Sequence, residues 1–236
     1  MDSRLFVCFC LLVVTRAEDF QRTLVVIYKQ TVPSEYLFLR GGDAEGNGIP
    51  IWQIVEPEKE SSKFRKLSEG DTMLDWHGRE EGQPKEAFGT PLMWTTNNQS
   101  YHLQTNKDGA GYFNINIAKG HMWIADLDMD CDKTHDGWFQ YKGFITQNGK
   151  PKYESNTYDG WEQVRGGSVC EGELLPDGEN FKSGFEWADP QNHFGKCGSF
   201  NFVSWGNGTF CFIHSIEFIE SLAPPESSEV EDETEK

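Results

Sequence analysis

Between its two ends the chain carries short apolar segments that favour β-strands. They are rich in aromatic and β-branched residues and are separated by Gly, Asn, Asp and Pro, the pattern of strands joined by turns. No stretch of a dozen residues keeps a clean helical period, and the one helical candidate, residues 56–67, is polar and fits a loop equally well. The expected strands are residues 23–29, 36–39, 112–117, 122–131, 138–145, 200–205 and 210–219. We therefore expect an all-β fold, an antiparallel β-sandwich of roughly seven to ten short strands.

The last two of these segments carry the clearest hairpin signal. Asn207 and Gly208 lie between them, and Asn-Gly is the preferred pair for a type I′ turn, in which both residues take positive φ. Asn207 also begins an Asn-Gly-Thr sequon, and Asn98 begins an Asn-Gln-Ser sequon. Both asparagines are candidate N-glycosylation sites, because a glycan at an exposed loop tip would not disturb the core.

The amino-terminal end has the features of a secretory signal peptide. Residues 5–14 are ten consecutive apolar residues, and the small residues Thr15 and Ala17 follow at the positions that a signal peptidase recognises. Ten residues are too few to cross a bilayer, which takes about 20, and no later segment is apolar for as long. We expect residues 1–17 to be removed and the chain to be secreted to the extracellular space, without membrane association. A core strand at residues 5–14 is the alternative.

Four cysteines remain beyond this segment. In an oxidising compartment they are expected to form two structural disulfides, with three possible pairings that the sequence does not separate. No two of them form a C-x-x-C pair, which disfavours a zinc knuckle or a thioredoxin-type site. The four are Cys131, Cys170, Cys197 and Cys211.

Acidic residues outnumber basic ones by 38 to 21, which gives a formal net charge of −17. Such a charge repels a phosphate backbone, so nucleic-acid binding is not expected. The 8 Trp, 7 Tyr and 17 Phe supply the apolar surface that folding needs. Residues 224–236 hold six acids and no large apolar residue, so we expect a disordered acidic tail that either solubilises the chain or binds Ca²⁺ or a basic partner. Residues 18–223 would then form a single β-sandwich module.

One expected strand alternates apolar residues with aspartates. Because side chains alternate faces along a strand, the aspartates would share one face at a spacing of about 7 Å. Such a row needs charge compensation, either from solvent and cross-strand Lys or Arg or from a Ca²⁺ ion held by the carboxylates. The EF-hand pattern is not met, since Cys131 and Gly137 occupy the positions of its Gly and Glu. The candidate metal ligands are Asp126, Asp128, Asp130 and Asp132.

No catalytic pattern stands out along the chain. Carboxylates that a glycosidase might use, such as Asp75, Glu80, Glu162 and Glu186, are too numerous to single out a pair. The sequence has no G-x-S-x-G, no Walker loop and no G-x-G-x-x-G, and its six His lack the spacing of a zinc site. We expect no enzyme activity and no cofactor other than the possible Ca²⁺.

Three tryptophans lie beside turn residues rather than inside expected strands. Flat aromatic rings stack on the apolar faces of sugar rings, while Asp, Asn, Gln and Glu fix the orientation of the sugar. Trp123, Trp138 and Trp205 fall within expected strands and are assigned to the core. For each loop tryptophan the alternative is burial beneath its own loop. The candidate carbohydrate-binding residues are Trp76, Trp94, Asp75 and Trp161.

Several blocks, taken in order, resemble a known family. Together they are similar to the C-terminal accessory domain attached to some bacterial and invertebrate α-amylases, over residues 23–218. Trp76, Asp75 and Trp94 fall inside these blocks. The blocks are residues 30–33 (QTVP), 37–42 (LFLRGG), 74–80 (LDWHGRE), 89–97 (GTPLMWTTN), 128–134 (DMDCDKT), 137–139 (GWF) and 193–198 (HFGKCG).

The resemblance implies a β-rich extracellular module without catalytic activity of its own. In some enzymes that domain is associated with binding of starch-type glucans and in others with secretion, and here the catalytic barrel that precedes it in the amylases is absent. We therefore expect a secreted, non-catalytic carbohydrate-binding module, with an α-glucan as the first candidate ligand. The alternative is an acidic extracellular matrix or mineral-associated protein that binds Ca²⁺ through the aspartate-rich strand and the tail.

Overall fold

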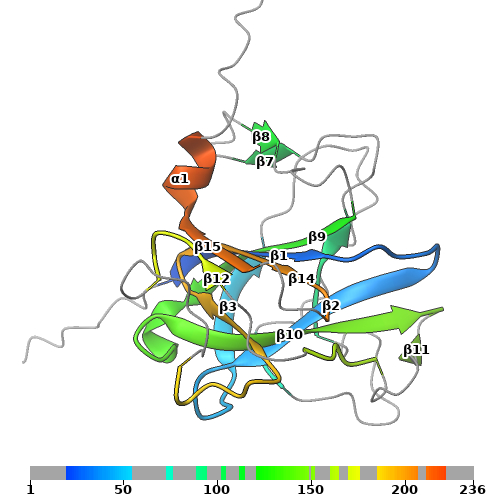
Figure 1. The fold of residues 1–236 in the computed structure, drawn as a ribbon, viewed down its shortest axis with the longest axis horizontal. Helices are drawn as coiled ribbons and strands as arrows, with labels where there is room; N and C mark the ends of the chain where they lie inside the picture. Colours follow the sequence, from blue (N-terminus) through cyan, green and yellow to red (C-terminus); the bar gives the residue numbers. More distant parts are fainter. Residues whose placement is uncertain are drawn as a thin grey trace, which may run out of the picture.

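The computed structural model shows fifteen strands, one short α-helix and a 3-10 turn in the residues that it describes (Figure 1). No helix in the part of the chain that it describes is long and apolar enough to cross a membrane. The structure describes residues 20–54, 73–76, 89–94, 102–104, 112–114, 121–148, 150–151, 160–164, 170–175, 185–206 and 211–221. Outside these ranges lie the expected signal peptide (residues 1–17) and tail (residues 224–236), the helical candidate at residues 56–67, and Asn98 and Asn207.

Two sheets make up the body of the fold. The large sheet has the strand order β12 (Cys170–Glu171), β15 (Cys211–Ser215), β14 (Ser199–Ser204), β1 (Phe20–Tyr28), β9 (Met122–Asp130), β3 (Ile49–Ile54), β4 (Met73–Leu74), with β6 (Met93–Trp94) also paired to β9. The small sheet has the order β11 (Lys150–Pro151), β10 (Trp138–Gln147), β2 (Glu35–Gly42), β5 (Thr90–Pro91), with β13 (His193–Lys196) also paired to β10. A separate pair is formed by β7 (His102–Gln104) and β8 (Tyr112–Asn114).

The all-β class is confirmed, with two departures in detail. Five of the strands are only two residues long, which accounts for much of the excess over the expected number. Most neighbours are antiparallel, but β1 pairs in parallel with β14, and β12 with β15. Parallel neighbours need a long connection between them, and β1 and β14 stand near opposite ends of the chain. The sequence pattern shows which segments are strands but not which distant strands meet.

The main core lies between the two sheets. On β9 the apolar residues of the alternating segment, Trp123, Ala125, Leu127 and Met129, are buried in it, as predicted from the period of two. The small sheet contributes Tyr141 and other inward-facing residues of β10 and β2. Each large apolar side chain buried in this way contributes about 1.5–3 kcal/mol.

A second apolar cluster covers part of the outer face of the large sheet. It joins residues of β1, β9 and β14 to Ile219 of α1 (Ile216–Ser221), and Figure 1 shows α1 on the other side of the large sheet from β10. The predicted strand at residues 210–219 is therefore wrong in its second half, because β15 ends at Ser215. The Ser215 hydroxyl accepts a hydrogen bond of 3.0 Å from Phe218 N, the interaction by which Ser begins helices.

The predicted hairpin strands are confirmed, since β14 and β15 pair antiparallel with Phe202 opposite Phe212. The Asn207-Gly208 turn itself lies outside the described residues.

Both predicted disulfides are present, as Cys131–Cys197 and Cys170–Cys211. Cys131 follows β9 of the large sheet and Cys197 follows β13 of the small one, so the first disulfide ties the two sheets together at one end. The second lies within the large sheet, between opposed residues of β12 and β15. With separations of 66 and 41 residues, each is worth about 4 kcal/mol on a loop-entropy estimate.

Candidate functional site

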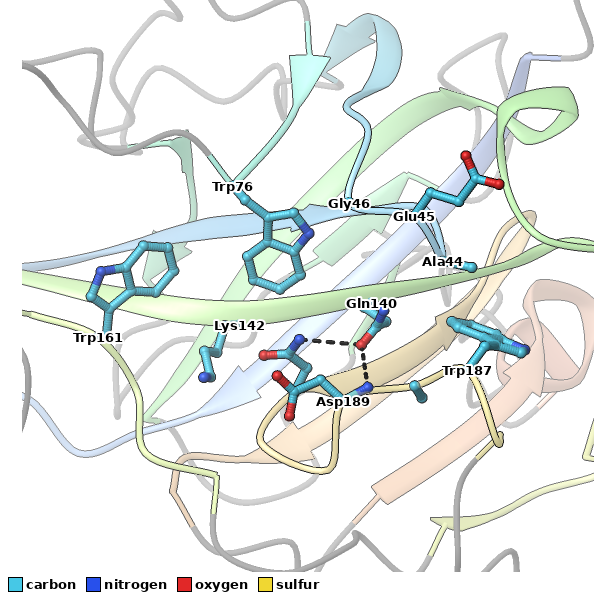
Figure 2. Close-up of a pocket in the computed structure, with 11 residues that line it drawn as sticks. Ala44, Glu45, Gly46, Trp76, Gln140, Lys142, Trp161, Trp187 and Asp189 are labelled. Atoms are coloured by element: carbon cyan, nitrogen blue, oxygen red, sulfur yellow. Dashed lines mark hydrogen bonds between the residues drawn. The ribbon is translucent and has the colours of Figure 1, made fainter.

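The outer face of the small sheet carries an open cleft of about 590 Å³ (Figure 2). That volume lies within the range of about 300–1,000 Å³ that small-molecule sites occupy. Gln140 and Lys142 of β10 line the cleft, whereas Phe139 and Tyr141, which alternate with them, are buried in the core. The remaining walls come from residues 44–46 after β2, from Trp76 and Trp161, and from residues 187–192. Segments far apart in the sequence therefore meet over one strand.

Three half-buried tryptophans define the cleft: Trp76, Trp161 and Trp187. The ring centroids of Trp76 and Trp161 lie 6.3 Å apart with a tilt of 34°, and Figure 2 shows Trp187 on the other side of Gln140 from them. Trp161 also packs edge-on against Phe144 of β10, at 5.3 Å. Two of the three loop tryptophans selected from the sequence thus meet in one site.

Trp76 packs closely against β2, where Gly42 has no side chain and Arg40 pairs with the neighbouring Asp75. A Cβ atom at Gly42 would lie 2.8 Å from the indole nitrogen of Trp76, so glycine is needed there for the ring to pack closely. Asp75, a predicted sugar contact, accepts a 3.1 Å hydrogen bond from Arg40 Nη1, and it is not among the residues that line the cleft. The pair links the residue next to Trp76 to β2, and the sugar contact of Asp75 stays a prediction.

Trp187 is a site residue that the sequence analysis missed. Its ring stacks on Phe185 at 5.0 Å and 15° and contacts His135 at 5.0 Å. Phe185 in turn packs against the buried Trp138 at 4.7 Å. The available signal was the same as for the other loop tryptophans, because Trp187 stands two residues before Asp189 in a segment with turn residues.

Gln140 fixes the segment that carries Trp187. Its side-chain oxygen accepts hydrogen bonds from Asp189 N at 2.8 Å and from Asn192 Nδ2 at 3.2 Å, drawn as dashed lines in Figure 2. Because the oxygen takes both bonds, the group that Gln140 offers to a ligand is its NH₂ donor.

The cleft mixes charges of both signs. Lys142 is the only cation among the described residues that line it, and Glu45 and Asp189 are the acids. Burial lowers the pKa of the Lys142 ammonium, while the carboxylates of Asp189 and Glu162 act in the opposite direction. The cleft thus presents aromatic surface together with hydrogen-bond donors and acceptors.

Four of the other five tryptophans lie elsewhere in the fold. Trp94 is on β6, opposite Trp123 of β9 in the large sheet, and its side chain is outside what the structure describes. Trp123 and Trp138 are buried in the core, as predicted, and Trp205 packs against the core while partly exposed.

On the aspartate-rich strand, a cross-strand arginine compensates the charge of Asp126. Arg22 of β1 donates from Nε and Nη2 to the two carboxylate oxygens of Asp126, at 3.0 and 2.7 Å. Arg22 stands opposite Asp128 in the strand register, so this is the predicted cross-strand arginine. Burial raises the pKa of Asp126, and the hydrogen bond and charge of Arg22 only partly oppose this.

The aspartates of this strand do not form an exposed acidic face. Asp126, Asp128 and Asp130 are 2%, 7% and 2% exposed, and only Asp132 is exposed. Asp130 accepts a 3.1 Å hydrogen bond from Asp132 N and thereby caps the 3-10 turn Cys131–Lys133. Across the described ranges, no group of three or more His, Cys, Asp or Glu is placed to hold a metal ion. The expected Ca²⁺ site on this strand therefore has no support from the geometry.

No protein-family model, no curated protein and no solved structure matches the chain. The resemblance to the α-amylase accessory domain stays a prediction.

Proposed function

We propose that the chain is a secreted, non-catalytic carbohydrate-binding module that holds a glycan in the cleft of the small sheet. The observation that carries this proposal is the convergence of Trp76, Trp161 and Trp187 around Gln140 and Lys142. Indole rings offer flat apolar area to the C–H faces of sugar rings, and the polar groups between them suit hydroxyl groups. The two disulfides are typical of an oxidising compartment and support secretion.

A neutral glycan suits the charges of the cleft. Glu45 and Asp189 outnumber Lys142, so an acidic sugar would meet a net repulsion. The resemblance to the amylase accessory domain makes an α-glucan the first ligand to test. The mineral-binding alternative loses its main support, because the strand that would present its aspartates buries three of them.

Retention on insoluble starch, chitin and cellulose tests the proposal. The secreted chain should be retained on at least one of these, and Trp76→Ala, Trp161→Ala and Trp187→Ala should each weaken binding about tenfold or more, the effect of truncating an aromatic hot spot. Phe218→Ala is the control, since Phe218 is an exposed aromatic residue on α1, at the outer face of the other sheet. Retention on none of the three polysaccharides, or equal retention of all four variants, would contradict the proposal.

A further inference from the structure

Beneath the cleft, the side chain next to Trp161 is buried in a polar network. Trp161 lines the cleft, whereas the carboxylate of the following residue, Glu162, is fully buried. It accepts hydrogen bonds from Gly143 N at 2.8 Å, from Gly206 N at 2.8 Å and from His193 Nε2 at 2.9 Å. These donors belong to β10, to the residues after β14, and to β13. One carboxylate therefore ties the Trp161 segment to three other parts of the fold.

The same segment is joined to β10 by its backbone. Glu162 N donates to Gly143 O at 2.9 Å, so Gly143 is bonded both to the main chain and to the side chain of Glu162. A Cβ at Gly143 would collide with the ring of Trp205 and would also lie 3.0 Å from Glu162 Oε2. Glycine at this position lets the Glu162 carboxylate approach β10. The distance between Glu162 and β10 in turn sets where the neighbouring Trp161 ring lies.

An ionised carboxylate satisfies this arrangement when Nε2 of His193 carries the proton. Both oxygens of an ionised Glu accept and neither donates, which suits three converging N–H donors. With Nε2 of His193 carrying its proton, a neutral amide or a protonated acid would direct a donor at one of these N–H groups, and an unsatisfied buried donor is costly. The network is thus matched to the ionised form of Glu162.

We propose that Glu162 is the positioning residue of the cleft: its ionised carboxylate holds Trp161 in the orientation that binds the ligand, and protonation of that carboxylate releases Trp161. This inference rests on the proposed function for the ligand, but not for the response of Trp161 itself. Glu162 does not touch the ligand in this scheme.

The groups around Glu162 support its ionised state near neutral pH. Burial raises the pKa of Glu162, but the charge and hydrogen bond of His193 and the two backbone N–H donors outweigh this, so its pKa lies below the ordinary value of 4.5. Among the described residues, Tyr141 and Lys142 of β10 also interact with Glu162. Burial, and then the charge of Glu162, hold the pKa of the Tyr141 hydroxyl well above its ordinary value, so it stays neutral. Lys142 adds a positive charge nearby.

The test is the indole N–H resonance of Trp161 in the full chain, assigned with Trp161→Phe and followed against pH. In the wild type this resonance should shift in a one-proton step below pH 4.5, with retention on the glycan falling in the same step. In Glu162→Gln the resonance should already be displaced at neutral pH, and the affinity should be about tenfold lower.

Glu173→Gln is the matched control. Glu173 is an exposed glutamate that also accepts from a backbone N–H, Ser215 N at 2.9 Å, and lies 4.0 Å from a histidine, His214. This variant should leave the Trp161 resonance and the binding unchanged.

An unshifted Trp161 resonance in folded Glu162→Gln would overturn the proposal. If that variant does not fold, the wild-type titration decides, because a Trp161 resonance that ignores acid while the chain stays folded would overturn it equally. If the Trp161 resonance responds as expected but the chain binds no glycan, the positioning role of Glu162 stands and only the proposed function is contradicted.

Discussion

The outer faces of the two sheets both carry polar residues, yet they use them differently. On the large sheet, the carboxylate of Asp126 is occupied on both oxygens by Arg22, and Asp130 caps a turn of its own chain. On the small sheet, Gln140 holds a loop in place while half-buried tryptophan rings remain around an open cleft. The aspartates therefore make contacts within the fold, whereas the indole rings around the cleft stay partly exposed.

Two buried carboxyls show the same contrast in electrostatic terms. Burial raises the pKa of Asp126, and a single arginine does not cancel that effect. Glu162 is buried at least as deeply, but His193 and two backbone N–H groups lower its pKa further than burial raises it. Nearby charges and hydrogen-bond donors, together with burial, decide which protonation state of a carboxyl the fold favours.

The largest effect is expected from Arg22→Ala, which breaks the compensation on the large sheet. Removing one partner of a buried ion pair leaves an uncompensated charge, so the free energy of unfolding should fall by about 3 kcal/mol. Glycan binding by the fraction that remains folded should not change, because Arg22 is on a strand of the large sheet and does not line the cleft. Denaturant unfolding and polysaccharide retention measure the two effects.

A second variant separates the charge from the packing. Arg22→Ala combined with Asp126→Asn removes both members of the pair and should recover a large part of the lost stability. If the double variant is no more stable than Arg22→Ala, the loss comes from the packing of the Arg22 stem and not from the charge of Asp126.

A smaller effect, of the opposite kind, is expected from Gln140→Ala on the small sheet. The two hydrogen bonds that hold the segment with Trp187 would be lost, and solvent can replace them because Asp189 is exposed. Affinity for the glycan should therefore fall about tenfold, while the free energy of unfolding changes by less than about 1 kcal/mol. Isothermal titration with a soluble oligosaccharide measures the first quantity. A large loss of stability with unchanged affinity would show that Gln140 serves the fold as Arg22 does.

Local features were predictable from the sequence. The period of two on β9 predicted which residues enter the core, and the position of a tryptophan inside or beside a strand separated Trp123 and Trp138 from Trp76 and Trp161. The number of disulfides followed from the cysteine count. Each of these depends on neighbours within a few residues along the chain.

Non-local features were not predictable. The contact between Trp76 and Trp161, the bond between Glu162 and His193 and the choice among three disulfide pairings all depend on which distant strands meet. The burial of Asp126 is of the same kind, since periodicity assigns a face to a side chain but not what covers that face. Helix α1 was missed for a local reason, because six residues are too few to show a helical period.

The smallest expected effect tests the direction in which the fold shifts the pKa values of Asp126 and Glu162. The pKa of Asp126 is raised in the folded state, so the stability it contributes is present below its ordinary pKa of 3.8 and is lost as pH rises through the folded value. The pKa of Glu162 is lowered, so its contribution is present above 4.5 and is lost as pH falls through the folded value. Relative to the wild type, Asp126→Asn should therefore gain stability as pH rises from about 4, and Glu162→Gln should gain stability as pH falls below about 4.5. Each slope is limited to about 1.4 kcal/mol per pH unit, the value for one proton. Denaturant unfolding of the three chains between pH 3 and 7 measures these slopes, and equal signs for the two variants would show that the same balance of burial and donors acts on both sheets.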